Sequence, residues 1–189
     1  VLTVIGLVAL AAAVVLVPGG ISARPAPGRI EALVAGQLRA LAIPRAAHDR
    51  TNPVPVSDDA IRDGLRHFAD HCAGCHANDG SGNTEVGRGL YPRAPDMRQP
   101  ATQELSDGDL FYIIENGVRF TGMPAWGTGT SDAENASWHL VHFIRRLPKL
   151  TEQDLARMGE LNPKSAEAWR AEDEARRFLG PDGAAKPAE

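Results

Sequence analysis

Cysteine is scarce in this 189-residue chain, with Cys72 and Cys75 as the only two. A structural zinc site usually takes four Cys or His ligands, so a second ligand pair would have to come from other histidines. Those histidines lie beside no further cysteine; they are His48, His67, His71, His139 and His142. The composition therefore speaks against a zinc knuckle and leaves room for one disulfide at most.

The chain also lacks a polybasic patch. Residues 1–56 carry five basic and two acidic side chains, residues 57–150 carry nine and thirteen, and residues 151–189 carry six and nine. The net charge is −4, and nothing in this distribution indicates nucleic-acid binding. Since we recognise neither an activated nucleophile nor carboxylates paired for acid–base chemistry, we do not expect an enzyme.

A third feature that is missing is the apolar–polar alternation of period two that marks β-strands. Apolar residues instead recur at steps of three and four, and the stretch from Ala77 to Gln103 is a glycine- and proline-rich loop. The sequence therefore predicts an all-α fold with long loops. In such a chain a bound cofactor would replace much of the missing core.

The segment Cys72-Ala73-Gly74-Cys75-His76 has the Cys-x-x-Cys-His spacing that attaches a c-type haem. Each thiol reaches one vinyl group, and His76 is the proximal iron ligand. A thioredoxin-like dithiol or a structural disulfide explains the cysteines but not the histidine. We therefore predict one covalently bound haem c. We also expect the carbonyl of Pro92 or Pro95 to accept the second N–H of the His76 ring.

The opposite face of the haem needs a second ligand, and the chain offers three methionines. Met123 lies in a turn-rich loop and is followed by Pro124, which restricts the backbone. Met97 is its competitor, and Met158 is a weaker candidate on a later helix. A histidine or an open position remains an alternative. A Met/His pair gives a higher reduction potential than two histidines.

The N-terminal residues Val1–Val17 form an uninterrupted apolar run with a single Thr. As a helix the run rises about 25 Å, and we predict a transmembrane anchor over residues 1–21. A cleaved signal peptide is the alternative, but its apolar core is usually shorter. Since haem is attached to such motifs outside the cytoplasm in bacteria, we expect an inner-membrane protein whose haem domain faces the periplasm.

Three further regions follow the anchor. Residues 22–56 are predicted as a linker with an amphipathic helix near 29–41, which would lie in the lipid interface, pack on a partner or cover the haem domain. Residues 57–150 are predicted as the haem domain, with helices at 58–70 and 110–114 and a last helix capped by Ser131. We expect His139 and His142 on that last helix to face solvent. Residues 151–189 are predicted as a polar helical tail, including a charged helix from Ser165 to Leu179 that is either solvated or a docking arm.

Together these motifs resemble the class I monohaem cytochrome c family, in a membrane-anchored form. The resemblance covers about residues 57–150 and implies that Met123 is the distal iron ligand. It also implies that Gly64 and Phe68 lie where the first and last helices cross. Only Lys149 falls in or beside this region, unlike the lysine ring of mitochondrial carriers. The motifs are Gly64-x3-Phe68-x3-Cys72-x2-Cys75-His76, Asn116-Gly117 and Thr121-Gly122-Met123-Pro124-Ala125-Trp126.

The function predicted from these features is single-electron transfer by a membrane-tethered haem c protein at the periplasmic face. Its partners would be membrane redox complexes as donor and acceptor, with the bilayer bound through residues 1–21 and residues 151–189 as a docking arm. A fixed haem subunit of a larger respiratory or photosynthetic complex is the first alternative. A haem-based gas or redox sensor with a weak sixth ligand is the second.

Overall fold

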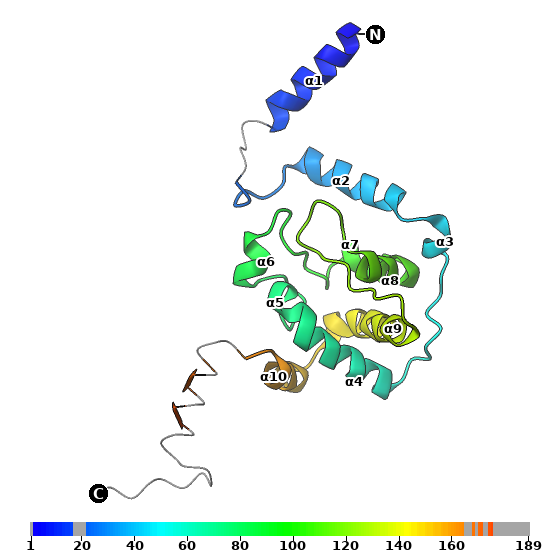
Figure 1. Cartoon of the computed structure of the whole chain (residues 1–189), viewed down its shortest axis with the longest axis vertical. Helices are drawn as coiled ribbons and strands as arrows, with labels where there is room; N and C mark the ends of the chain where they lie inside the picture. Colours follow the sequence, from blue (N-terminus) through cyan, green and yellow to red (C-terminus); the bar gives the residue numbers. More distant parts are fainter. Residues whose placement is uncertain (1, 17–21, 165–167, 169, 172–173, 176–189) are drawn as a thin grey trace, which may run out of the picture.

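The computed structural model describes residues 2–16, 22–164, 168, 170–171 and 174–175. Every regular element in these residues is helical, which confirms the predicted all-α class (Figure 1). The elements are α1 (Leu2–Leu16), α2 (Arg29–Ala42), α3 (Arg45–His48), α4 (Asp58–His67), the π-helical turn η2 (Phe68–Cys72), α5 (Ala73–His76), α6 (Glu85–Gly89), α7 (Pro100–Gln103), α8 (Asp107–Asn116), α9 (Ser131–Arg146), the 3₁₀ turn η3 (Leu147–Lys149) and α10 (Glu152–Leu161).

Among the described residues, no helix is both long enough and apolar enough to cross a membrane. The transmembrane anchor predicted over residues 1–21 is therefore not confirmed. Residues 17–21 of that prediction lie outside the described residues.

Side-chain caps set the start of the main helices. The hydroxyl of Ser57 accepts a hydrogen bond from the backbone N–H of Ala60, and α4 begins at the predicted residue. Ser106 caps α8 with a reciprocal bond from its own backbone N–H to the Asp109 carboxylate. The cap of α9 is Thr130, one residue before the predicted Ser131. Helix α4 ends at His67, because the chain continues as the wider turn η2 up to Cys72.

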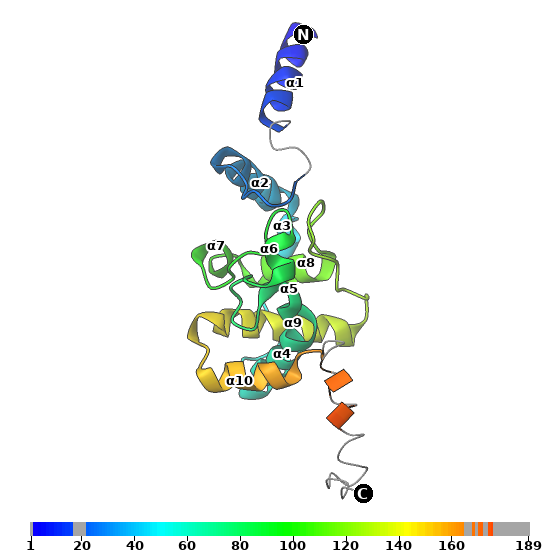
Figure 2. The same cartoon turned by 90° about the vertical axis from the view of Figure 1, so that its left-hand side faces the viewer.

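The core forms where α4 and α8 pack against α9, with α10 against η2 and α4 (Figures 1 and 2). The rings of Phe68 and Phe143 lie 5.1 Å apart, and those of Phe111 and Trp138 stack at 4.0 Å. Gly64 permits the crossing, since a Cβ there would lie 2.2 Å from the carbonyl oxygen of His139. The implied contact between the first and last helices of the domain is therefore present.

Helix α10 belongs to this core as well. Met158 is 0% exposed, and Leu150 and Leu161 pack against the same cluster. The first part of the predicted polar tail over 151–189 is thus packed against η2 and α4. Most of the predicted helix from Ser165 to Leu179 lies outside the described residues.

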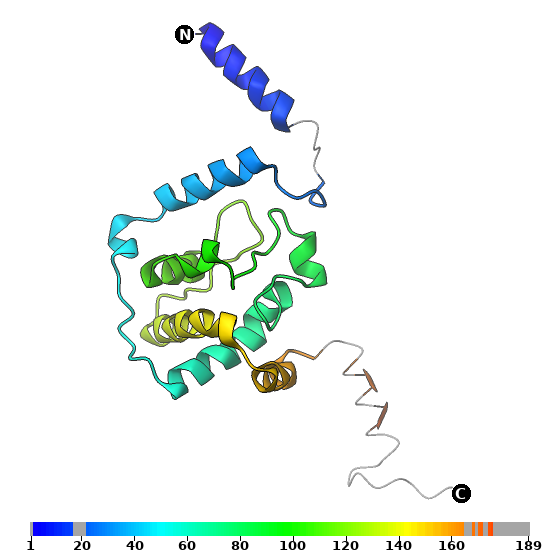
Figure 3. The same cartoon turned by 180° about the vertical axis from the view of Figure 1, so that it is seen from behind.

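The chain between α3 and α4 runs as a strap along one side of the domain (Figure 3). Asn52 donates a 3.0 Å hydrogen bond to the carbonyl of Trp138, and the Nε2 of His142 lies 2.8 Å from the carbonyl of Val54. His142 is buried, so the expectation that it faces solvent is wrong. A residue that ties the strap to α9 cannot point into water.

The upper end of the strap is held by an ion pair. The Nδ1 of His48 lies 3.0 Å from both carboxylate oxygens of Asp109. The hydrogen bond to Asp109 raises the pKa of His48. Burial alone would raise the pKa of Asp109, but the hydrogen bonds from His48 and Ser106 outweigh it and hold that pKa below its ordinary value.

We expect this pair to make stability depend on pH. The His48 contribution is complete below its unfolded pKa and is lost as the pH rises through the raised folded pKa. The Asp109 contribution is complete above its unfolded pKa and is lost as the pH falls through the lowered folded pKa. The pair should therefore stabilise most between about pH 4 and 6.5. Thermal unfolding of wild type and His48→Gln from about pH 2 to about pH 9 measures it. The stability difference between the two proteins should be largest between about pH 4 and 6.5 and shrink on either side, and parallel curves over the whole pH series would contradict it.

Candidate haem-attachment site

The segment from Cys72 to His76 lies at a change of helix type. Cys72 ends η2, and Cys75 and His76 end α5, where Ala77 turns the chain with φ of +60°. Single π turns inside helices occur frequently at functional sites. The side chains beneath the segment, Phe68, Ala69 and Ala73, are buried in the core. Both thiols and the imidazole are therefore presented from a packed support.

The two cysteines are free and half-buried. Burial, with a smaller contribution from Cys75, raises the pKa of Cys72 to about 12. Redox dithiols need a thiol whose pKa is lowered, so this environment speaks against the thioredoxin-like interpretation. In the described part of the chain, no three His, Cys, Asp or Glu side chains are grouped to hold a metal ion, which gives no support to a zinc knuckle either.

His76 provides the test of whether a haem fits. Burial lowers the pKa of its ring, which favours the neutral imidazole that binds metals. Its Nδ1 is buried and has no hydrogen-bond partner, so the predicted bond to Pro92 or Pro95 is not formed. An unpaired buried polar atom costs about 1–3 kcal/mol and needs an explanation. A half-buried histidine with a lowered pKa, beside two free thiols, fits a c-type haem.

The loop after His76 folds back onto the end of α5. Gly82 donates a 2.8 Å hydrogen bond to the carbonyl of His76, and Thr84 donates a 3.2 Å bond to that of Cys75. Gly87 passes so close that a Cβ there would lie 2.2 Å from the Cys75 carbonyl oxygen. The loop therefore fixes the backbone of two predicted haem-binding residues.

An arginine closes the same loop further along. Arg98 pairs with Asp79 at 2.9 Å and with Asp96 at 2.8 Å. The hydrogen bond from Arg98 is the main reason that the pKa of Asp96 lies far below its ordinary value. These bonds join the start and the end of the loop that follows the attachment motif.

Met123 lies in the loop between α8 and α9, in a tight set of backbone bonds. Its N–H donates to the hydroxyl of Thr121 at 3.1 Å, and its carbonyl accepts from the N–H of Val118 at 3.1 Å. Three residues later, the ring of Trp126 meets the ring of His71 edge-on at 5.4 Å. Because His71 precedes Cys72, the structure brings the Met123 loop against the segment that carries the thiols.

The three methionines differ in burial. Met97 and Met158 are buried members of the core cluster, whereas Met123 is half-buried and lies outside it. The backbone of Met97 is also held, through bonds to Gly80 and Gln103. Met97 and Met158 therefore have the environment of side chains that fill a core. This difference favours Met123 as the distal ligand, and the assignment stays a prediction.

Residues 59–144 match the family model described as "Cytochrome C oxidase, cbb3-type, subunit III". This segment contains the attachment motif, the Met123 loop and the crossing of α4 with α9. Residues 59–144 form a class I cytochrome c domain. A search of curated proteins finds no significant match to the chain. A cytochrome c domain binds haem c and transfers electrons, and it does not catalyse a reaction by itself.

The cytochrome c domain uses two threonines that we did not predict from the sequence. Thr84 holds the carbonyl of Cys75, and Thr121 holds the N–H of Met123. Thr121 has a local signal, because a Ser or Thr hydroxyl often bonds the backbone two residues on. For Thr84 the sequence indicates only a helix cap, because its hydroxyl accepts a hydrogen bond from the backbone N–H of Gly87 at the start of α6. Its bond to Cys75 depends on how the loop folds.

Gly117 of the cytochrome c domain supports the Met123 loop directly. It has φ of +65°, and a Cβ there would lie 2.6 Å from the carbonyl carbon of Pro124. We expect Gly117→Ala to destabilise the domain by about 1–3 kcal/mol and to displace the loop. Urea unfolding measures the first effect, and the reduction potential of the haem-loaded protein reports the second. Wild-type values for both would contradict the role.

Proposed function

We propose that this protein is a membrane-anchored monohaem c-type cytochrome that passes single electrons between redox complexes at the periplasmic face. The observation that carries the proposal is the presentation of Cys72, Cys75 and a half-buried His76, whose pKa is lowered by burial, from one packed helix end in the cytochrome c domain.

Each residue has a distinct task in this proposal. The S–H groups of Cys72 and Cys75 add across the two vinyl groups, which forms two thioether bonds and needs no oxidant. His76 and Met123 would be the two protein ligands of the haem iron. Haem c supplies an iron that cycles between the ferrous and ferric states. Phe68 of the core lies 6.5 Å from the His76 ring and limits how far this ligand would move.

The membrane location is proposed from the apolar run Val1–Val17, which carries no charged residue. The periplasmic orientation is proposed because haem attachment to this motif takes place outside the cytoplasm in bacteria. A tether raises the local concentration of the domain near membrane partners. Strong electrostatic docking by a lysine ring is then unnecessary, in agreement with the shortage of lysine around the haem domain.

Spectroscopy and voltammetry of the purified protein test the proposal. We expect a reversible one-electron wave, the ferrous absorption band of low-spin haem c, and haem that stays bound after denaturation. The variant Cys72→Ser/Cys75→Ser should lose the covalently held haem. The absence of a reversible wave would overturn the electron-transfer function. Carbon monoxide binding by the wild-type ferrous protein at neutral pH would instead favour the sensor.

A fixed subunit of a terminal oxidase is the second candidate function, favoured by the name of the matching family model. Truncation after Lys164 separates the two candidates, because it keeps α10 and its buried Met158 in the core. A subunit that assembles through its C-terminal segment should be lost from the purified complex, whereas a free carrier should keep its electron-transfer rate. A truncation at residue 151 would also damage the core and could not discriminate.

A further inference from the structure

Helix α2 keeps an apolar stripe in contact with solvent. Positions at steps of three and four place five aliphatic side chains on one side of the helix, and no residue of α2 is buried. The exposed fractions lie between 47% and 81%, for Ile30, Leu33, Val34, Leu38 and Leu41. Such an exposed stripe in an otherwise well-packed protein indicates an interaction surface.

The position of α2 is defined by bonds to the cytochrome c domain. The Tyr91 hydroxyl donates to the Glu31 carboxylate, and Arg93 donates a 2.9 Å hydrogen bond to the carbonyl of Arg24. After α2 the chain is held by the buried Ile43 and by the pair of His48 with Asp109. The stripe is therefore presented at one end of the domain while both ends of α2 are attached.

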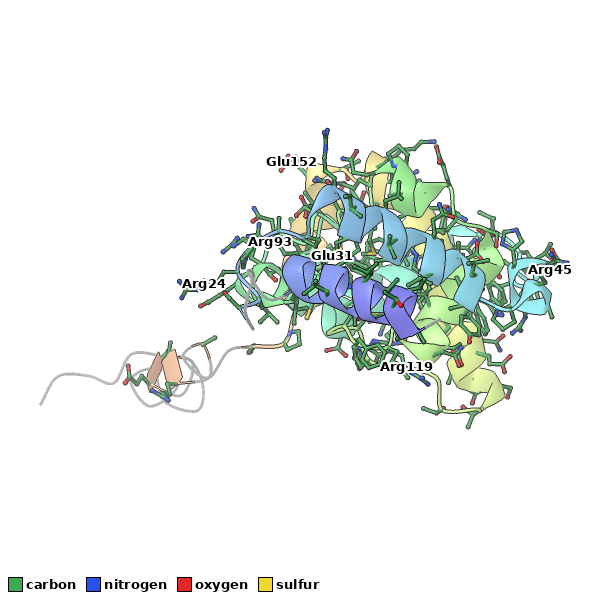
Figure 4. All side chains as sticks on the ribbon, turned by 90° about the horizontal axis from the view of Figure 1, so that it is seen from above. Arg24, Glu31, Arg45, Arg93, Arg119 and Glu152 are labelled. Carbon is green, nitrogen blue, oxygen red and sulfur yellow. The ribbon has the colours of Figure 1, made fainter. Side chains whose placement is uncertain are left out.

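The charge of this segment differs from that of the rest of the chain. Residues 22–50 have five arginines and two acidic residues, whereas residues 51–189 have fifteen basic and twenty-two acidic residues. Arg24, Arg29, Arg39 and Arg45 are exposed, and none of the ion pairs among the described residues includes them. Seen from above, Arg24 and Arg45 lie beyond opposite ends of α2 (Figure 4). The stripe is thus flanked by positive charge.

Two neighbouring elements extend the apolar surface. The described side chains of α1 are all apolar or small and exposed, and α1 precedes α2 at the same end of the molecule (Figures 1 and 2). The α8–α9 loop rises toward that end, and its Phe120 is 93% exposed. The α2 stripe itself has no aromatic residue, although aromatic anchors dominate most protein interfaces. These features favour a lipid surface over a protein partner.

We propose that α2 lies in the headgroup region of a membrane rich in anionic lipid, with its aliphatic stripe inserted and its arginines among the headgroups. The strap between α3 and α4 then fixes the orientation of the domain on the membrane. The end that carries the Met123 loop faces the lipid surface, and the acidic remainder faces away. This contact adds to the tether proposed above and depends on neither that tether nor the haem.

Hydrogen exchange of the full chain with lipid vesicles tests the proposal. Vesicles of phosphatidylcholine with roughly a quarter of phosphatidylglycerol should slow exchange of the amides in residues 29–42 by about tenfold or more, and high salt should weaken the effect. Leu41→Glu should raise the lipid concentration needed for half-protection by about tenfold. The matched control Ala32→Glu adds the same charge on the other side of α2 and should change it by less than about threefold.

Several outcomes would overturn the proposal. Unchanged exchange in residues 29–42 on bound vesicles would mean that α2 does not touch lipid. Equal protection by vesicles of phosphatidylcholine alone would show that α2 does not require anionic lipid. Protection that rises with protein concentration without vesicles would assign the stripe to a second copy of the chain, and protection only by added membrane proteins would assign it to a protein partner. The redox assays in detergent remain independent of all these results.

Discussion

Replacing Met123 with leucine is expected to convert the ferrous protein from one that excludes carbon monoxide at neutral pH into one that binds it. Leucine keeps nearly the same volume but lacks the thioether sulfur, so the substitution removes a ligand and leaves the loop intact. The reduction potential should fall by on the order of 100 mV, because a Met/His pair favours ferrous iron. Carbon monoxide titration and voltammetry measure the two effects.

The other methionines supply matched controls for this experiment. Met97 and Met158 are buried in the core, and leucine at either position removes a sulfur without opening a large cavity. We expect Met97→Leu and Met158→Leu to keep the wild-type spectrum and potential, at a cost in stability below about 1.5 kcal/mol. If Met97→Leu bound carbon monoxide and Met123→Leu did not, the ligand would be Met97 and our assignment would be wrong.

Gly64→Ala should cause a large loss of stability, because it adds a methyl group where two helices cross in close contact. The new Cβ would lie 2.2 Å from the His139 carbonyl oxygen and 2.8 Å from the Cβ of Phe143. Both neighbours belong to α9, so the helices must separate along the crossing that supports Phe68 and the attachment motif. We expect a loss of about 3 kcal/mol, which lowers the melting temperature by roughly 12–20 °C.

Gly159→Ala is the control for this prediction. Gly159 is also in a helix, but nothing lies within 4 Å of its added Cβ. Alanine there should be neutral or should stabilise by about 0.5–1 kcal/mol, because it restricts the unfolded chain. Thermal unfolding of both variants separates steric crowding from helix propensity. A melting temperature for Gly64→Ala within a few degrees of wild type would refute the close crossing.

Local signals predicted several elements correctly. The spacing of Cys72, Cys75 and His76 indicated haem attachment without knowledge of the fold, and the helix predicted from residue 58 begins at that residue in the structure. Asn116-Gly117 marked the end of α8, where Gly117 has a positive φ. These signals depend on residues within a few positions of one another, so one sequence suffices to read them.

Burial that depends on segments distant in the sequence could not be predicted from such local signals. A polar residue such as His142 on a helix is expected to face solvent. It is buried here because the strap passes over it at Val54. Met158 lies in a stretch that is polar overall, yet α10 packs it against η2 and α4. In both cases the partner is far away in the sequence, and periodicity along one segment cannot identify it.

By itself, therefore, the sequence determined that the chain carries a haem-attachment motif, that it is helical, and that its N-terminal segment is apolar and basic, since all three follow from residue types and short spacings. The tertiary structure alone decided that the Met123 loop meets the thiol-bearing segment through Trp126 and His71, that the Nδ1 of His76 is buried without a partner, and that α2 is held with its stripe exposed. Those properties arise from burial and from contacts between distant segments, which only the folded chain brings together.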